Sequence, residues 1–294
     1  MEIFTHSRYW DEGVYISDLL KNYFEKNGHI VHKICDNKIS KIPNIKYDIA
    51  FGWGLSNTLK HVRDELNVPT LVFDLGMIKR TETPMTNDGY FRCGIYDEKW
   101  LNIDKRGDSS RFDELCLDYG DYSKKDGLIA FMGQIPGDVS HGMGEDDLIS
   151  WSRRIIVKLN EKYPNQIVYK PHPHAAHMSK QKLFMDQLSQ MGVMVDRSTN
   201  RIETLDVKNK YRCVFSYCST SLVHFIINGI PVVASKNSMF HELVSDIDGD
   251  WDIDFKPDQE IKQKWFNAMA YSQWNKEEIS NGLLFNNLKK YLIK

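Results

Sequence analysis

Side chains that could bind an anionic ligand are concentrated in three segments of the sequence, each placed directly after a short apolar run. The first is the glycine-rich stretch 133–144, whose glycines allow a ligand to approach the backbone closely. Within it, Gln134, Asp138 and Ser140 offer side-chain hydrogen bonds. These residues suit an anion-binding loop, and an ordinary glycine-rich connection is the alternative interpretation.

The second segment, VYKPHPHAAHM, combines a lysine, two prolines and three histidines. Prolines stiffen a turn, so we expect Lys170, His172 and His174 to point at a ligand with little conformational entropy left to lose. This arrangement suits a diphosphate. Structural histidines are one alternative, and a metal site completed by His177 is another. We predict no metal, because no neighbouring Cys or carboxylate completes a ligand set.

The third segment, SYCSTS, places hydroxyl groups immediately before an apolar helical pattern. Ser219, Thr220 and Ser221 are therefore expected at a helix N-terminus, where backbone N–H groups bind anions. A simple helix cap is the alternative role for these side chains. Glu242, in the later stretch SMFHEL, is a candidate acceptor of hydrogen bonds from ribose hydroxyls.

Alternating strand and helix patterns would position these segments. A strand at 2–5 is followed by a helical spacing that ends at Gly28, and further strands and a helix continue to residue 76. A second alternating series begins near residue 126, and 259–274 and 276–294 read as terminal helices. Such alternation predicts parallel sheets with functional residues in loops at the carboxyl ends of the strands.

We therefore predict an α/β fold of two doubly wound, Rossmann-like lobes with C-terminal helices, the architecture called GT-B. The predicted domains are an N-terminal lobe over residues 1–125, a C-terminal lobe over 126–270 and a helical tail over 271–294. A two-domain reductase or a kinase-like fold would show the same alternation of strands and helices. The sequence contains no GxGxxG, GxxxxGK[ST], GxSxG or HExxH motif, which argues against dehydrogenases, P-loop kinases and hydrolases.

Composition limits the partners and the compartment. With 38 Lys+Arg against 40 Asp+Glu and a net charge of −2, the chain has no long-range basic field for nucleic acid or anionic membranes. Five widely spaced cysteines without a CxxC pair favour a reducing cytoplasm over a disulfide framework. We expect a soluble, cytoplasmic protein, because neither a signal-peptide pattern nor an apolar run of the roughly 20 residues that a membrane span needs is present.

Five motifs together resemble bacterial capsule polysaccharide synthesis and export proteins of the Kdo-transferase type, including small relatives in phage genomes. These motifs are GQ-x3-D-x-S from Gly133, Y-K-P-H-P from Tyr169, T-S-L-x6-G-x-P-V-V from Thr220, QW-x3-EI-x2-G from Gln273, and FDLGMIKR with YFRCG. The resemblance implies a GT-B glycosyltransferase that needs no cofactor besides its nucleotide-sugar donor. It also implies donor binding in the C-terminal lobe, at Gln134, Lys170, His172, Ser219, Thr220 and Ser221. The Phe-Tyr-Ala-Gly-Trp motif of the family is replaced here by KNSMFHEL, which leaves the donor sugar open.

An inverting, metal-independent transfer would need a general base in the N-terminal, acceptor-side lobe. Asp11 is the first candidate, with Glu12 beside it and Asp74 in FDLG as the reserve. A capping role for Asp11 at the following helix is the alternative. Lys170, His172 and the helix N-terminus at Thr220 would stabilise the leaving phosphate, so no divalent ion is required.

Two acceptor classes fit this chemistry. A hydroxymethylated pyrimidine in phage DNA is favoured over a capsule or surface glycan, because no convincing amphipathic basic helix for a membrane-linked glycan is present. Local contacts with DNA would come from Lys79-Arg80 and Lys105-Arg106. A module that binds a sugar nucleotide or a glycan without transferring the sugar is the alternative from another class.

Overall fold

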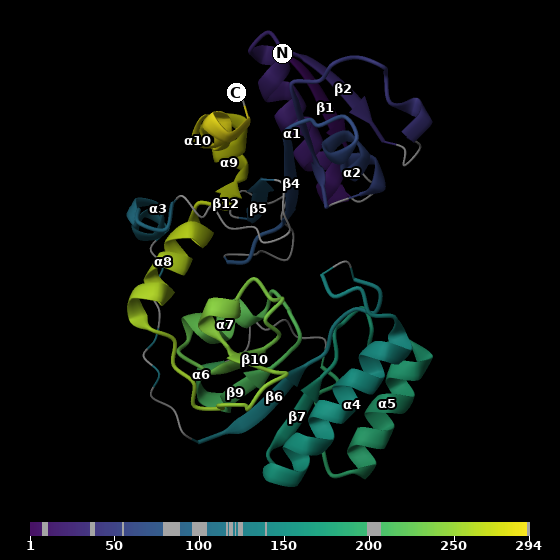
Figure 1. Ribbon diagram of the computed structural model, residues 1–294, viewed down its shortest axis with the longest axis vertical. Coiled ribbons are helices and arrows are strands. Elements are labelled where there is room, and N and C mark those ends of the chain that lie inside the picture. The colour runs from purple at the N-terminus through teal and green to yellow at the C-terminus, as the bar shows by residue number, and fades with distance from the viewer. Residues whose placement is uncertain are drawn as a thin grey trace. The chain divides into compact units, whose positions relative to one another are not determined.

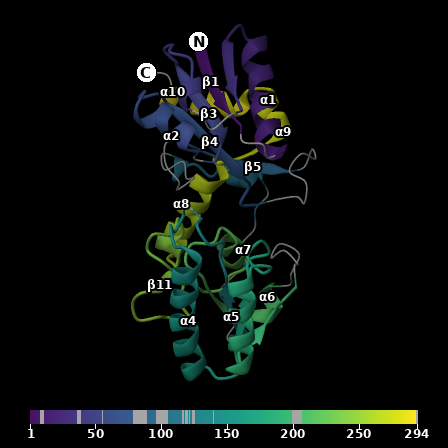
Figure 2. The ribbon, with the colours of Figure 1, turned by 90° about the vertical axis from the view of Figure 1, so that its right-hand side faces the viewer.

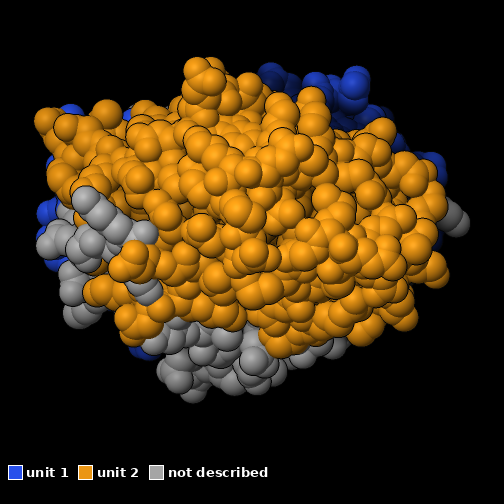
Figure 3. Space-filling model, turned by 90° about the horizontal axis from the view of Figure 1, so that it is seen from below, with its two compact units in different colours: residues 1–115, 263–294 blue, residues 116–262 orange. Residues whose placement is uncertain are grey.

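The computed structural model describes residues 1–7, 11–35, 39–54, 56–78, 89–95, 105–115, 117, 120, 122, 126–138, 140–198 and 207–292. The chain divides into two compact units, shown in different colours in Figure 3. Unit 1 comprises residues 1–115 and 263–294, and unit 2 comprises residues 116–262. The boundaries therefore differ from the predicted ones at 125/126 and 270/271, and the C-terminal tail belongs to unit 1 rather than forming a domain of its own.

Unit 1 is built on a six-stranded sheet with the order β12-β5-β4-β3-β1-β2. Four of its strands are parallel, whereas β5 runs antiparallel to β4 and β12 antiparallel to β5. The strands are β1 (Glu2–His6), β2 (Ile30–Ile34), β3 (Ile49–Trp53), β4 (Thr70–Leu75), β5 (Tyr90–Ile95) and β12 (Gln273–Asn275). The helices are α1 (Asp11–Lys26), η1 (Ile39–Lys41), α2 (Asn57–Asp64), α3 (Ser110–Glu114), α8 (Gln259–Ala270, whose first residues belong to unit 2), α9 (Lys276–Ser280) and α10 (Leu283–Leu292).

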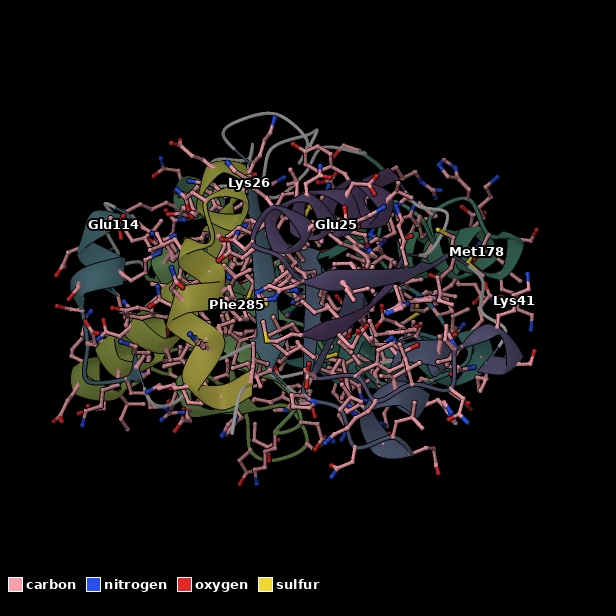
Figure 4. The ribbon with its side chains drawn as sticks, turned by 90° about the horizontal axis from the view of Figure 1, so that it is seen from above. Glu25, Lys26, Lys41, Glu114, Met178 and Phe285 are labelled. Atoms are coloured by element: carbon pink, nitrogen blue, oxygen red, sulfur yellow. The ribbon has the colours of Figure 1, made fainter. Side chains whose placement is uncertain are left out.

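The core of unit 1 unites both ends of the chain. Alternate strand residues such as Ile3 and Phe51 are fully buried, and they pack with the apolar face of α1 and with residues of the tail. Phe285 of α10, labelled in Figure 4, meets Phe24 of α1 edge-on with ring centroids 5.0 Å apart. This shared apolar core explains why the tail is an integral part of the unit.

The prediction of an uninterrupted helix over 259–274 is wrong. Helix α8 ends at Ala270, and the strand β12 follows, with Trp274 fully buried in the core. The side chain of Gln273 accepts a hydrogen bond from the backbone N–H of Met77 at 2.8 Å, and its carbonyl accepts one from Arg111 at 2.9 Å. These long-range contacts override the local helical pattern.

Unit 2 contains a six-stranded sheet in which every observed pairing is parallel, with the order β11-β10-β9-β6-β7-β8. Counted from β6, this is the order 3-2-1-4-5-6 of dinucleotide-binding folds. The strands are β6 (Leu128–Met132), β7 (Ile167–Lys170), β8 (Met194–Val195), β9 (Tyr211–Phe215), β10 (Val232–Ala234) and β11 (Ser245–Asp246). The helices are α4 (Glu145–Lys162), α5 (Ser179–Gln190), α6 (Val207–Lys210), α7 (Leu222–Ile227) and η4 (His241–Leu243).

Helices α4 and α5 lie side by side on one face of this sheet (Figures 1 and 2). Their buried residues, among them Ile156 and Phe184, pack against Phe131 and Phe215 of the strands. The chain order of the strands reverses between β6 and β9, so this sheet has its topological switch point there. Ligands of such sheets bind at the switch point, outside the carboxyl ends of the strands.

None of the helices in the described part of the chain combines the length and the apolar character that crossing a lipid bilayer requires.

Candidate functional site

The three predicted ligand-binding segments come together at one edge of the unit 2 sheet. They follow β6, β7 and β9, which are neighbours in the order β9-β6-β7 and run parallel. The backbone N–H of Gly133 donates to the carbonyl of Lys170 at 2.8 Å, which joins the first and second segments. The backbone N–H of Cys218 donates to Oε1 of Gln134 at 3.1 Å, which joins the first and third. The bond between Gln134 and Cys218 spans the switch point between β6 and β9, and the bond between Gly133 and Lys170 links β6 to β7.

Gly133 has a steric role at this edge. A Cβ atom at this position would lie 2.7 Å from the hydroxyl oxygen of Tyr169 and 3.2 Å from Cα of Pro171. Tyr169 is fully buried, and its hydroxyl donates to Gln181 at 3.3 Å, so the ring cannot move aside easily. The close packing of the first and second segments therefore requires glycine.

Gln134 has its side-chain amide committed to Cys218. Besides accepting from the Cys218 backbone, it donates through Nε2 to Sγ of Cys218 at 3.3 Å. Only 8% of Gln134 is exposed. The geometry makes this residue a brace between two loops, rather than the freely presented hydrogen-bonding group that the sequence predicted.

Asp138 and Ser140 form the exposed part of the first loop. Oδ1 of Asp138 accepts from the backbone N–H of Ser140 at 2.8 Å, and the Asp138 carbonyl accepts from Gly142 at 2.8 Å. The carboxylate thus shapes the turn. The hydroxyl of Ser140 accepts a hydrogen bond from the thiol of Cys218 at 3.2 Å.

Lys170 is not aimed outward, which corrects the expectation from the sequence. Its side chain is 3% exposed, and Nζ donates to Asp196 at 3.3 Å and to the carbonyl and hydroxyl of Ser198 at 3.1 and 3.0 Å. Three donor hydrogens thereby meet three acceptors, which is the full capacity of an ammonium group. Lys170 thereby anchors the turn 171–174, which we call the proline-histidine turn, to the segment after β8.

The two histidines of that turn lie closer to solvent, with His172 half-buried and His174 exposed. Their rings stack with centroids 5.5 Å apart, and Nδ1 of His172 accepts the backbone N–H of His174 at 3.2 Å. This bond assigns the hydrogen of a neutral His172 ring to Nε2. Within the described ranges, no group of three or more His, Cys, Asp or Glu side chains has a geometry that could hold a metal ion.

The third segment differs from the expected helix N-terminus with open N–H groups. Helix α7 has six residues, and the backbone N–H groups of Leu222, Val223 and His224 already donate to carbonyls of the preceding turn. The hydroxyls of Ser219 and Ser221 lie 2.8 Å apart and bond to each other. Ser219, Thr220 and Ser221 are all half-buried, so hydroxyl groups rather than helix amides are what this turn presents.

The candidate general bases lie in unit 1. Helix α1 begins at Asp11, so Asp11 and Glu12 lie in its first turn. Their side chains lie outside the described part of the structure. Asp74 is in β4, where Oδ2 pairs with Arg92 at 2.5 Å and Oδ1 accepts the backbone N–H of Leu75 at 2.6 Å. These bonds hold Asp74 in a structural ion pair.

The last predicted ligand-binding residue of unit 2 is Glu242. Glu242 is half-buried in η4, beyond the end of β10. Two residues that the sequence reasoning missed, Cys218 and Asp196, bond directly to Gln134 and Lys170. Their only sequence signal was their position, since Asp196 directly follows β8 and Cys218 comes three residues after β9.

Comparison with solved structures identifies the fold. The Thermosulfurimonas dismutans KpsC β-Kdo 2,7-transferase is 15% identical over 98% of this chain and 100% of its own, with a TM-score of 0.53. The β-Kdo 2,4-transferase of the same organism's KpsC is 12% identical over 95% of this chain and 98% of its own, with a TM-score of 0.55. No family model matches the sequence, and no curated protein matches it.

The chain therefore has the GT-B fold of the Kdo transferases, with two Rossmann-like units and C-terminal helices. This confirms the fold class and the structural resemblance that the sequence motifs predicted. At 12% and 15% identity the likeness extends to the fold alone.

Proposed function

We propose that the protein is a glycosyltransferase that binds a nucleotide-sugar donor on unit 2 and transfers the sugar to a hydroxyl group. The observation that carries this proposal is the arrangement of the 133–144 and 216–221 loops at the topological switch point of a 3-2-1-4-5-6 sheet. Switch points of this kind bind nucleotides. The bond between Gln134 and Cys218 holds the two loops together there.

The donor phosphate would be bound by hydroxyl and imidazole donors at this edge. We assign direct contacts to Ser140, His172 and the Ser219–Ser221 turn, because their side chains are exposed or half-buried. Gln134, Asp138 and Lys170 position these groups, and Glu242 is retained for the ribose. Neutral donors in a preorganised site stabilise a leaving phosphate without a divalent cation.

The transfer step is proposed to invert the anomeric centre. A carboxylate in the first turn of α1, Asp11 or Glu12, removes the proton of the acceptor hydroxyl. At the same time the oxygen of that hydroxyl bonds to the anomeric carbon. The bond from that carbon to the donor phosphate breaks, and the nucleotide leaves with the electron pair. Asp74, held by Arg92, supports the architecture of unit 1 in this scheme.

The acceptor is proposed to be a hydroxyl of a capsule or surface glycan. The solved neighbours are named as Kdo transferases, which puts a Kdo nucleotide first among donors to test. A hydroxymethylated pyrimidine of phage DNA remains the second acceptor class. Of the basic pairs considered for DNA contact, Lys79-Arg80 lies outside the described residues, and Lys105 is paired with Asp108 at 3.0 Å.

Release of free nucleotide from a panel of nucleotide sugars tests the proposal, with a glycan acceptor, hydroxymethylated duplex DNA or neither added. Turnover that depends on one acceptor supports the transferase and names the acceptor class. Asp11→Asn should lose turnover and keep donor affinity, whereas Asp64→Asn, on the exposed end of α2 in the same unit, should change neither. Donor binding without release under every condition identifies a binding module instead, and no binding overturns the proposal.

A further inference from the structure

A chain of hydrogen bonds leads from Gln134 through Cys218 to Ser140, and it crosses the switch point of unit 2. Nε2 of Gln134 donates to Sγ of Cys218 at 3.3 Å, and the Cys218 thiol donates to Oγ of Ser140 at 3.2 Å. The first residue lies 84 positions from the second, so the chain joins the loops after β6 and β9. Every donor points in the same direction along it.

The direction of these bonds determines what Ser140 can do. Because its oxygen accepts the thiol hydrogen, its own hydroxyl hydrogen is directed away from Cys218. Ser140 is exposed, and its backbone N–H is fixed by Asp138 at 2.8 Å. A fixed, exposed hydroxyl with its hydrogen turned outward suits an acceptor such as a phosphate oxygen.

Hydrogen bonds in such a chain strengthen one another. An N–H group that donates to sulfur makes the thiol a better donor, and the thiol in turn makes the serine hydroxyl a better donor. The side-chain amide of Gln134 is fixed in the orientation that lets Nε2 donate to the sulfur, because its Oε1 accepts the Cys218 backbone N–H at 3.1 Å. Cys218 and Gln134 are each only 8% exposed, so water has little access to the hydrogen bond between them.

We propose that Cys218 is a positioning residue that orients and polarises the Ser140 hydroxyl for hydrogen bonding to a phosphate of the donor nucleotide. This inference rests on the proposed function, because it specifies how that donor is recognised. It assigns the cysteine a role through Ser140 rather than through direct contact with the ligand.

The test is a double-mutant cycle on donor affinity, measured by calorimetry on the full chain. The titrants are the nucleotide sugar that binds the wild-type protein and, separately, inorganic pyrophosphate. Ser140→Ala should weaken binding about tenfold, the usual loss for one hydrogen bond to a charged group. Cys218→Ala should weaken binding by a smaller factor, and the double variant should bind no more weakly than Ser140→Ala alone.

Two further variants separate positioning from a structural role. Cys218→Ser should restore most of the affinity, because a hydroxyl can accept from Gln134 and donate to Ser140. Cys35→Ala, a thiol deletion in unit 1 next to Ser7, should leave affinity unchanged. Thermal unfolding of every variant is measured in parallel, and the affinity losses should appear without matching losses in melting temperature.

The outcomes distinguish this inference from the proposed function. Losses that add in the double variant, or full affinity in Cys218→Ala, overturn the role of Cys218 while leaving donor binding intact. Wild-type protein that binds neither a nucleotide sugar nor pyrophosphate overturns both.

Discussion

The ammonium nitrogen of Lys170 lies 3.3 Å from Oδ2 of Asp196, and this ion pair fixes the end of β7 to the segment that follows β8. The pair is largely enclosed, with 3% and 16% of the two side chains exposed. A lysine that was predicted from the sequence to bind the ligand therefore makes its hydrogen bonds within the protein. Its influence on a ligand acts through the turn that it anchors.

Lys170→Met should therefore destabilise unit 2 and weaken donor binding together. Removing one partner of a fully buried pair costs 3–5 kcal/mol, and the partial exposure of Asp196 reduces our expectation to about 2 kcal/mol. Lys180→Met is the control, because Lys180 pairs with Asp146 on the surface of the same unit. Chemical unfolding should show the loss for Lys170→Met only, and equal stability of the two variants would disprove the buried role.

The same pair predicts a dependence of stability on pH. Burial raises the pKa of Asp196, but hydrogen bonds from Ser198 and the charge of Lys170 outweigh it, so this pKa lies below its usual value. A carboxyl group with a lowered folded-state pKa contributes stability above its unfolded pKa of about 3.9 and loses it as the pH falls through the folded pKa.

Unfolding of the wild-type protein and of Asp196→Asn should be compared from pH 7 down to pH 3. The variant should be less stable near neutrality, and the difference in unfolding free energy should shrink below about pH 4. A difference that stays constant across this range would contradict the assignment.

Gly133→Ala tests whether close packing of the first two segments shapes the site. The added methyl group would lie 2.7 Å from the Tyr169 hydroxyl, so we expect lower stability and weaker donor binding. Tyr169→Phe removes the nearest atom and should partly restore both in the double variant. Calorimetric titration and thermal unfolding provide the two readouts, and failure of the second substitution to help would point to the Pro171 contact instead.

The tail motif QW-x3-EI-x2-G has a structural explanation in unit 1. Trp274 is buried beneath Arg111, Glu278 pairs with Arg111 at 2.5 Å, and a Cβ on Gly282 would lie 2.3 Å from the ring of Tyr23. That ring also packs against the rings of Phe24 and Phe285, which contact each other. The motif therefore fastens the end of the chain onto the first sheet.

Gly282→Ala and Gly28→Ala form a matched pair for this explanation. Both glycines have a left-handed backbone, with φ of +80° and +77°, but nothing lies within 4 Å of a Cβ added at Gly28. Each substitution should cost about 1 kcal/mol for the backbone conformation, and Gly282→Ala should cost a further 1–3 kcal/mol for overpacking. Equal losses in equilibrium unfolding would show that Tyr23 yields without cost.

The features that could be predicted from the sequence are those that depend on neighbouring residues, such as the strands, the helices and the loops that follow the strands. The strand and helix alternation identified the two Rossmann-like units, and the motifs located the loops that gather at the switch point. The roles of Lys170 and Gln134 could not be predicted, because their partners lie 26 and 84 residues away in the sequence. Strand β12 was missed for a similar reason, since its helical pattern is overridden by pairing with β5.

The most direct test of donor binding on unit 2 is a crystal structure of the protein soaked with its donor nucleotide. We expect the phosphate at the carboxyl ends of the unit 2 strands, between the loops after β6 and β9, with Ser140 within hydrogen-bonding distance of a phosphate oxygen. A nucleotide bound elsewhere, or one that contacts neither loop, would contradict it.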